Sequence, residues 1–265
     1  MSEQRPGPGI DTSVSHVARI WNYWLGGKDN YPVDREVGDQ ILGILPDVAR
    51  LARASRRFLN RVVGYLAAEA GVRQFIDIGT GLPTVDNTHE VAQRAAPESR
   101  IVYVDNDPLV LAHAKSLLTS TPEGGTAYID ADLREPAGIL AGAAETLDFD
   151  EPIAFTLMGV LEFVPDDAQA YRVVRRLMDA VTSGSYFAMY DGTNVVHGEA
   201  SDRIVDVWNA SGNAQLTLRT PEQIAGFFEG LDMVEPGIVP VTHWRPDTPG
   251  EPEAVDAFGG VGRKP

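Results

Sequence analysis

The spacing of apolar residues changes character near residue 70. Before that point, apolar side chains recur every three or four positions, which is typical of helices that bury one face. The first of these helices can be capped by Ser13 or Ser15 and is ended by the pair Gly26-Gly27. The pattern therefore predicts that residues 12–70 form a helical segment without strands.

From Gln74 onward, short runs rich in β-branched and aromatic residues alternate with stretches of helical spacing. This alternation predicts a parallel sheet covered by helices on both faces. The runs FIDI and IAFTLM are apolar almost throughout, as expected for strands buried on both sides. The late runs LDMVE and IVPVTHW are joined only by Pro-Gly, which is too short for a helical crossover, so we expect them to pair antiparallel.

The two ends of the chain are polar and rich in Pro and Gly, which is typical of flexible termini. The sequence thus divides into a disordered tail at 1–11, the helical segment at 12–70, an α/β core at 71–246 and a flexible tail at 247–265. The expected fold class is α/β, with a mostly parallel sheet and an antiparallel last strand.

Composition narrows the classes of function. The chain carries 38 acidic and 22 basic side chains, a formal net charge of −16, so its surface should repel a nucleic-acid backbone. Cysteine is absent, which excludes disulfides and zinc–thiolate sites, and no His-x-x-x-His pair favours a metal site. No stretch is long and apolar enough to span a membrane and no apolar leader is found, so we expect a cytoplasmic protein without membrane contact.

Ligands of a parallel sheet bind at the carboxyl ends of its strands, so the residues that follow each strand carry the candidate chemistry. The first strand leads into Asp77-Ile-Gly-Thr-Gly, in which Gly79 and Gly81 permit a tight turn and the close approach of a ligand. Thr84 stands where a dinucleotide fingerprint has its third glycine. Asp77 would repel a pyrophosphate on this loop and would favour a ligand that carries an ammonium group.

Acidic residues also end the next two strands. Asp105 can accept hydrogen bonds from both hydroxyls of a ribose, because Asp107 is better placed to cap the helix that starts at Pro108. Asp132 can accept a hydrogen bond from an exocyclic amine such as that of adenine. After the fourth strand, Glu162 is the one ionisable side chain of an apolar stretch, and it is a base, a substrate anchor or a partly exposed loop acid.

These features together resemble the class I S-adenosylmethionine-dependent methyltransferases, whose glycine loop, ribose acid and adenine-side acid are matched by Asp77-Ile-Gly-Thr-Gly, Asp105 and Asp132. HVARIWNYWLGGKDNYPVDRE at 16–36, with FIDIGTGLPTVDNTHEVAQ and IVYVDNDPLVLAHA, resembles more closely a bacterial S-adenosyl methyltransferase family once classed as a domain of unknown function. This resemblance implies a Rossmann-like seven-stranded sheet and S-adenosyl-L-methionine as cofactor, and it leaves the substrate open. Pro83 departs from the common form of the glycine loop.

The resemblance also implies which residues contact the cofactor. The N-terminal helical segment would lie across the cofactor as a lid, with Tyr23 and Gly27 facing it, whereas Trp24 and Leu25 are interpreted as core contacts. The implied cofactor residues are Tyr23, Gly27, Asp77, Gly79, Thr80, Gly81, Asp105, Asn106, Asp132, Leu133, Met158 and Gly159.

The expected reaction is methyl transfer to an unidentified small-molecule acceptor, with Glu162, Tyr23 and His197 as candidate bases where the nucleophile must lose a proton. A non-catalytic protein that binds S-adenosylmethionine as a sensor is an alternative, because no base stands out. A nicotinamide-dependent oxidoreductase is a weaker alternative, because the third glycine and a Tyr-x-x-x-Lys pair are absent. The sequence indicates neither a metal site nor an oligomeric state.

Overall fold

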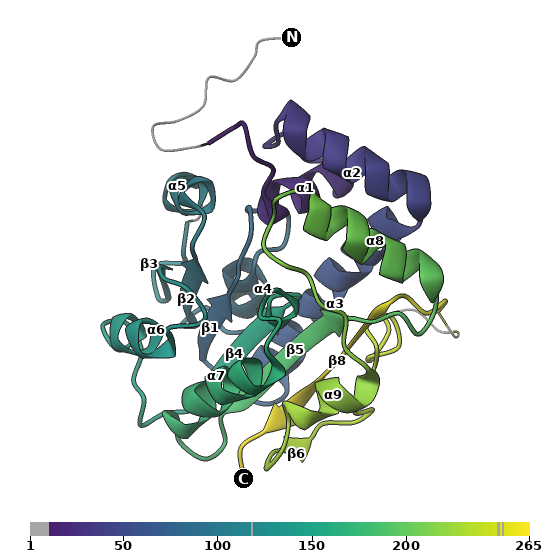
Figure 1. The fold of residues 1–265 in the computed structure, drawn as a ribbon. Helices are drawn as coiled ribbons and strands as arrows, with labels where there is room; N and C mark the ends of the chain where they lie inside the picture. Colours follow the sequence, from purple (N-terminus) through teal and green to yellow (C-terminus); the bar gives the residue numbers. More distant parts are fainter. Residues whose placement is uncertain (1–10, 118, 248–249, 251) are drawn as a thin grey trace.

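A central sheet organises the computed structural model, which describes residues 11–117, 119–247, 250 and 252–265 (Figure 1). Its parallel strands are β1 (Gln74–Ile78), β2 (Arg100–Asp105), β3 (Gly125–Asp130), β4 (Ile153–Met158) and β5 (Tyr186–Gly192). Within the described residues the strand order is β3-β2-β1-β4-β5-β8-β6, with the short β7 paired to β8. The chain reverses order between β1 and β4, and this switch point opens a crevice at the carboxyl edge. The α/β, Rossmann-like fold class is confirmed, although the sheet of the described residues has eight strands rather than the expected seven, because β6 and β7 both pair with β8.

The strands alternate with helices, as their spacing predicts. The helical elements are α1 (Val17–Trp24), α2 (Pro32–Ile44), α3 (Val48–Ala68), α4 (Thr88–Ala95), α5 (Pro108–Leu117), α6 (Pro136–Ala143), the 3-10 turn η1 (Leu161–Phe163), α7 (Asp167–Asp179), α8 (Glu199–Ala210) and α9 (Pro221–Gly226). None of the described helices combines the length and the apolarity that a bilayer crossing requires.

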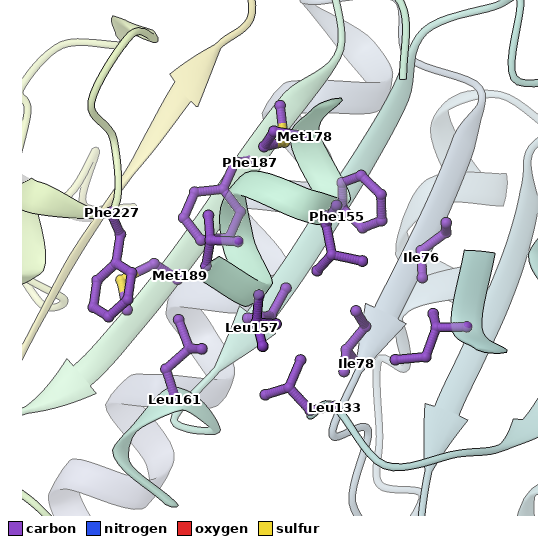
Figure 2. Packing of buried hydrophobic residues seen from close by; sticks show 14 of the residues in the cluster. Ile76, Ile78, Leu133, Phe155, Leu157, Leu161, Met178, Phe187, Met189 and Phe227 are labelled. Atoms are coloured by element: carbon purple, nitrogen blue, oxygen red, sulfur yellow. The ribbon is translucent and has the colours of Figure 1, made fainter. Parts of the chain in front are cut away.

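Alternate residues of each strand face opposite layers, because side chains along a strand point to opposite faces of the sheet. Phe75 and Ile101 pack against α3 and α4 on one face. Ile76 and Ile78 pack against α6 and α7 on the other, where Figure 2 shows them beside Phe155. Because the layers on both faces are apolar, the sequences of the strands are nearly continuous apolar runs.

The N-terminal helical segment has two separate positions. α3 lies flat on the sheet, where its residues belong to the same apolar cluster as β1. α1 and α2 instead pack with α8 near the carboxyl ends of the strands, around a cluster that includes Ile20, Trp24 and Trp208 (Figure 1). The placement of Trp24 in a core is therefore confirmed. Within the predicted segment 12–70, only α1 and α2 lie over the carboxyl ends of the strands, whereas α3 is part of the layer that packs on the sheet.

The prediction of a flexible tail at 247–265 is wrong for its last part. Residues 257–263 form β8, which lies antiparallel to β5 between that strand and β6. The glycines that suggested flexibility permit close packing: a Cβ on Gly259 would lie 2.2 Å from the carbonyl oxygen of Met189. The end of the strand is tied down by Lys264, whose Nζ donates to the carbonyls of Met178 and Val181. The predicted disordered tail at 1–11 falls, except for Asp11, outside the described residues.

The expected pairing between LDMVE and IVPVTHW is also wrong. These runs contain β6 (Asp232–Met233) and β7 (Val239–Pro240), and each pairs antiparallel with β8 rather than with the other. β6 meets β8 at one end and β7 meets it at the other, so the two are successive pieces of one edge. The antiparallel strand of the sheet is β8, whose neighbours are far away in the sequence.

Local helix signals are mostly confirmed. Thr220 and Gln223 form the reciprocal capping box at the start of α9. α1 is capped by His16 rather than by Ser13 or Ser15, because its Nδ1 accepts a hydrogen bond from the backbone of Ala18 at 3.3 Å.

Substitution of Gly259 tests the close approach of β8 to β5. We expect Gly259→Ala to lower the free energy of unfolding by about 1–3 kcal/mol, because the new methyl group meets backbone that cannot rotate away. Gly138→Ala in α6 is the control, since no atom lies within 4 Å of its added Cβ and alanine favours a helix. Urea unfolding followed by circular dichroism measures both. Equal stability of the two variants would contradict the placement of β8.

Candidate active site

A cavity of about 270 Å³ opens at the carboxyl edge of the sheet, at the switch point. It is enclosed by the ends of β1, β2 and β4, by one face of α1 and by part of α3. Most of the predicted cofactor residues line it, namely Asp77, Gly79, Thr80, Gly81, Asp105, Asn106, Asp132, Leu133, Met158 and Gly159. Residues scattered over more than 80 positions of the sequence are thus brought to one cavity, which we call the first cavity.

The glycine loop after β1 is shaped by two left-handed residues. Gly79 has a φ of +70° and Gly81 a φ of +66°, a conformation that side chains disfavour. A Cβ on Gly79 would lie 2.3 Å from Cγ2 of Val160, whereas a Cβ on Gly81 would meet nothing within 4 Å. The backbone amide of Gly79 donates to the carbonyl of Val104 at 2.8 Å, which fixes the loop to β2. Gly81 therefore presents bare backbone to the first cavity.

Asp107 rather than Asp105 caps α5, as the sequence predicts. Asp107 caps α5 by accepting from the backbone of Leu109 at 2.8 Å, and it lies 2.9 Å from Nδ1 of His16. Asp105 accepts from the amides of Gly81 and Asp107, both at 2.9 Å. Its burial raises its carboxyl pKa. Each of its oxygens keeps a lone pair for a further donor.

The other two strand-end acids, Asp77 and Asp132, also accept hydrogen bonds within the protein. Asp77 is buried, and its two oxygens accept hydrogen bonds from the hydroxyls of Thr88 and Thr156. Burial raises the pKa of this carboxyl. Asp132 accepts from the backbone amide and the guanidinium of Arg134, which lower its carboxyl pKa. Both acids line the first cavity with partners already in place.

Two predicted cofactor residues, Tyr23 and Gly27, do not line the first cavity. The hydroxyl of Tyr23 donates to Asp39 on α2 at 2.6 Å. A Cβ on Gly27 would lie 2.3 Å from Nδ2 of Asn22, so this glycine permits the close packing of the asparagine.

Val17 lines the first cavity, and beside it one face of α1 contributes Ala18, Trp21, Asn22 and the C-cap residue Leu25. The residues of this face follow the i, i+3, i+4, i+7 spacing of one helix face. The predicted face, through Tyr23, lies one position further along and meets α2 instead. The sequence does not single out Asn22 as a site residue, although Ala18, Trp21 and Leu25 on the same helix face show the apolar spacing of a face that is covered.

A smaller cavity of about 80 Å³ adjoins the first and shares Trp21, Phe163 and Tyr190 with it. We call it the second cavity. Its remaining wall is mostly apolar and includes Trp208 and Ile204 of α8. A cavity with mostly apolar walls is suited to apolar groups of a ligand.

Glu162 lines the second cavity and is buried. Its Oε2 accepts from the amide of Gly192 at 2.7 Å, and burial raises the pKa of the carboxyl to about 7. Of the three interpretations of Glu162, the partly exposed loop acid is therefore wrong. Behind it, the fully buried Arg219 donates to Asp191 at 2.7 Å, and Asp191 accepts from the amide of Glu162 at 3.1 Å.

His197 lines neither cavity. Its Nδ1 lies 2.7 Å from Oδ2 of Asp256, which also accepts from the hydroxyl of Ser201 at 2.8 Å. This cluster fastens the loop after β5 to the segment that precedes β8. The sequence does not predict the contact between His197 and Asp256, because Asp256 lies in the stretch whose composition indicates a flexible tail.

Among the described residues no group of His, Asp and Glu side chains has the arrangement of a metal site.

Comparisons with known proteins agree with this geometry. A family model described as S-adenosyl methyltransferase matches residues 3–265. The crystal structure of a DUF574 family protein from Streptomyces avermitilis MA-4680 is 47% identical, with a TM-score of 0.92, over 96% of this chain and 99% of that one. A protein from Thermobifida fusca YX proposed to be a methyltransferase is 38% identical, with a TM-score of 0.90, over 98% of both chains.

A more distant match shows the fold alone. The structure of the mitomycin 7-O-methyltransferase MmcR is 16% identical, with a TM-score of 0.53, over 88% of this chain and 69% of that one.

The buried pair of Arg219 and Asp191 gives a prediction on stability. We expect Arg219→Met to lower the free energy of unfolding by about 3–5 kcal/mol, because Asp191 would stay buried without its counter-charge. Arg175→Met is the control: its ion pair with Glu229 is exposed, and exposed pairs contribute about 0–1 kcal/mol. Chemical denaturation measures both variants. A loss for Arg219→Met as small as that of the control would refute the interpretation.

The raised pKa of Glu162 gives a pH dependence of opposite sign to that of an ordinary ion pair. Between its ordinary value of 4.5 and about 7, the folded protein keeps a proton that the unfolded chain releases. The contribution of Glu162 to the free energy of unfolding therefore falls as the pH rises through this window and is level above it, whereas burial raises the pKa of the neighbouring Asp191 carboxyl to about 8, which extends the fall toward that pH. We expect Glu162→Gln to flatten this fall relative to the wild type. Thermal unfolding at pH 5, 6, 7 and 8 measures the difference, and parallel curves would argue against it.

Proposed function

Because the chain belongs to the S-adenosyl methyltransferase family, its cofactor is S-adenosyl-L-methionine and its reaction is methyl transfer, and on that basis we propose that the methyl acceptor is a small, largely apolar molecule held in the second cavity. The carrying observation is the position of this cavity, which shares three aromatic walls with the first cavity. The nicotinamide-dependent and sensor alternatives receive no support from the comparisons.

The first cavity fits the cofactor by the chemistry of its walls. Gly81 leaves backbone open to a ligand, and Asp105 has lone pairs for two ribose hydroxyls. Leu133 and Met158 supply apolar surface on which adenine can pack. When bound, the cofactor supplies an electrophilic methyl group on a sulfonium. The residues of this cavity would position it, which lowers the entropic part of the barrier.

The second cavity suits an acceptor that is more apolar than charged. Trp21 of α1, Phe163 of η1 and Trp208 of α8 supply flat apolar surface. The net charge of −16 disfavours a nucleic acid as acceptor.

Glu162 is the candidate base in this proposal. It is an acid in the wall of the second cavity, and a pKa of about 7 allows it to take a proton from the acceptor near neutral pH. Asp191 and Arg219 support it from behind by fixing its backbone. Tyr23 and His197, the other candidates, line neither cavity.

Filling the second cavity separates acceptor binding from cofactor binding. We expect Ile204→Trp to reduce kcat/KM for methyl transfer at least about tenfold, equivalent to about 1.4 kcal/mol, and to leave the affinity for S-adenosylhomocysteine unchanged. Transfer of a tritiated methyl group to a panel of small phenols, amines and N-heterocycles measures the rate. Calorimetry measures the affinity.

Asp206→Trp, on an exposed position of α8, is the matched control and should preserve both. Undiminished transfer in Ile204→Trp would count against the second cavity as the acceptor site. A folded wild-type protein with no affinity for S-adenosylhomocysteine would contradict the function itself.

A further inference from the structure

Arg56 stands out among the residues of the first cavity. It lies on α3 and lines the cavity together with its neighbour Ser55. Its Nε is buried and has no hydrogen-bond partner among the described residues. A buried donor left without a partner costs free energy, so a ligand that supplies an acceptor would be favoured there.

The other basic side chains that line the first cavity lie close to carboxylates. Nδ1 of His16 lies 2.9 Å from Oδ2 of Asp107, and the guanidinium of Arg134 contacts Asp132. Arg56 forms no ion pair with a described carboxylate. The charge of Asp77 acts on it through space, without a hydrogen bond between the two side chains. Asp77 accepts hydrogen bonds from Thr88 and Thr156 rather than from Arg56, so Nε of Arg56 is left without a partner among the described residues.

The charges of the first cavity select where an anion can lie. Asp77, Asp105 and Asp132 all line it and would repel a carboxylate from their surroundings. The methionine end of the cofactor carries one carboxylate beside an ammonium. A guanidinium binds a carboxylate through two parallel hydrogen bonds, a geometry that a lysine does not offer.

We propose that Arg56 binds the carboxylate of the methionine part of S-adenosyl-L-methionine. The proposal rests on the cofactor that the family brings, and it names the residue that recognises the amino-acid end. Asp77 then has a supporting part: it anchors Thr88 and Thr156 and balances the charge of Arg56 from behind. This differs from the direct contact with the ammonium group that the sequence suggested for Asp77.

The test compares two ligands that differ only by the carboxylate. S-adenosylhomocysteine has it, and the decarboxylated compound keeps the adenosine, the thioether and the amine. We expect the wild type to bind S-adenosylhomocysteine about 10- to 100-fold more tightly. In Arg56→Gln this preference should fall to less than about threefold, through a loss of affinity for S-adenosylhomocysteine alone. Calorimetry measures all four affinities.

Arg57→Gln is the matched control, because Arg57 is the next residue of α3 and is exposed outside the first cavity. It should keep the wild-type preference. Arg56→Lys provides a second variant in case the glutamine variant does not fold. It retains the charge without the fork, so we expect it to lose affinity for S-adenosylhomocysteine several-fold and to bind the decarboxylated compound as the wild type does.

Two results would overturn the proposal, and they differ in what else they overturn. If the Arg56 variants bind both ligands equally more weakly, Arg56 supports the cavity without recognising the carboxylate, and the proposed function stands. If the folded wild type binds neither ligand, the assignment of the cofactor fails together with the proposal.

Discussion

The close approach of β8 to β5 is the constraint on which the rest of the site depends. A strand with glycines at 259, 260 and 262 can lie against the backbone of β5, where a side chain on Gly259 would collide with Met189. Asp256, directly before that strand, holds the loop after β5 through the backbone amides of Val196 and His197. This loop leads into α8, so the last residues of the chain position one wall of the second cavity.

Buried charged side chains lie at both cavities. Arg219 and Asp191 form a pair that is wholly inside the protein, next to the carboxyl of Glu162. Arg56 and Asp77 line the first cavity, where Asp77 accepts hydrogen bonds from the hydroxyls of Thr88 and Thr156 and the buried Nε of Arg56 has no hydrogen-bond partner among the described residues. A buried charge is costly unless it is paired, so the unpartnered Nε of Arg56 in the wall of the first cavity marks a place for a ligand. The cost of an unpartnered buried charge thus bears both on the stability of the fold and on the recognition of a ligand.

Helical spacing located α1 but did not select its functional face. Successive residues of a helix point about 100° apart, so a face drawn through Tyr23 and one drawn through Asn22 are neighbours in sequence and diverge in space. The first meets α2 at Asp39 and the second meets the cavity. The difference depends on where α2 packs, which no pattern within α1 encodes.

The sequence by itself determined the features that depend on near neighbours. These include the alternation of strands and helices, the left-handed glycine turn at Gly79 and the capping role of Asp107. The tertiary structure decided what depends on residues distant along the chain. It turned the Gly-rich end into β8, brought Glu162 next to Gly192 and left Arg56 inside the first cavity. The physical reason is that burial and pairing of a charge are set by its surroundings in space, whereas turns and caps are set within a few residues.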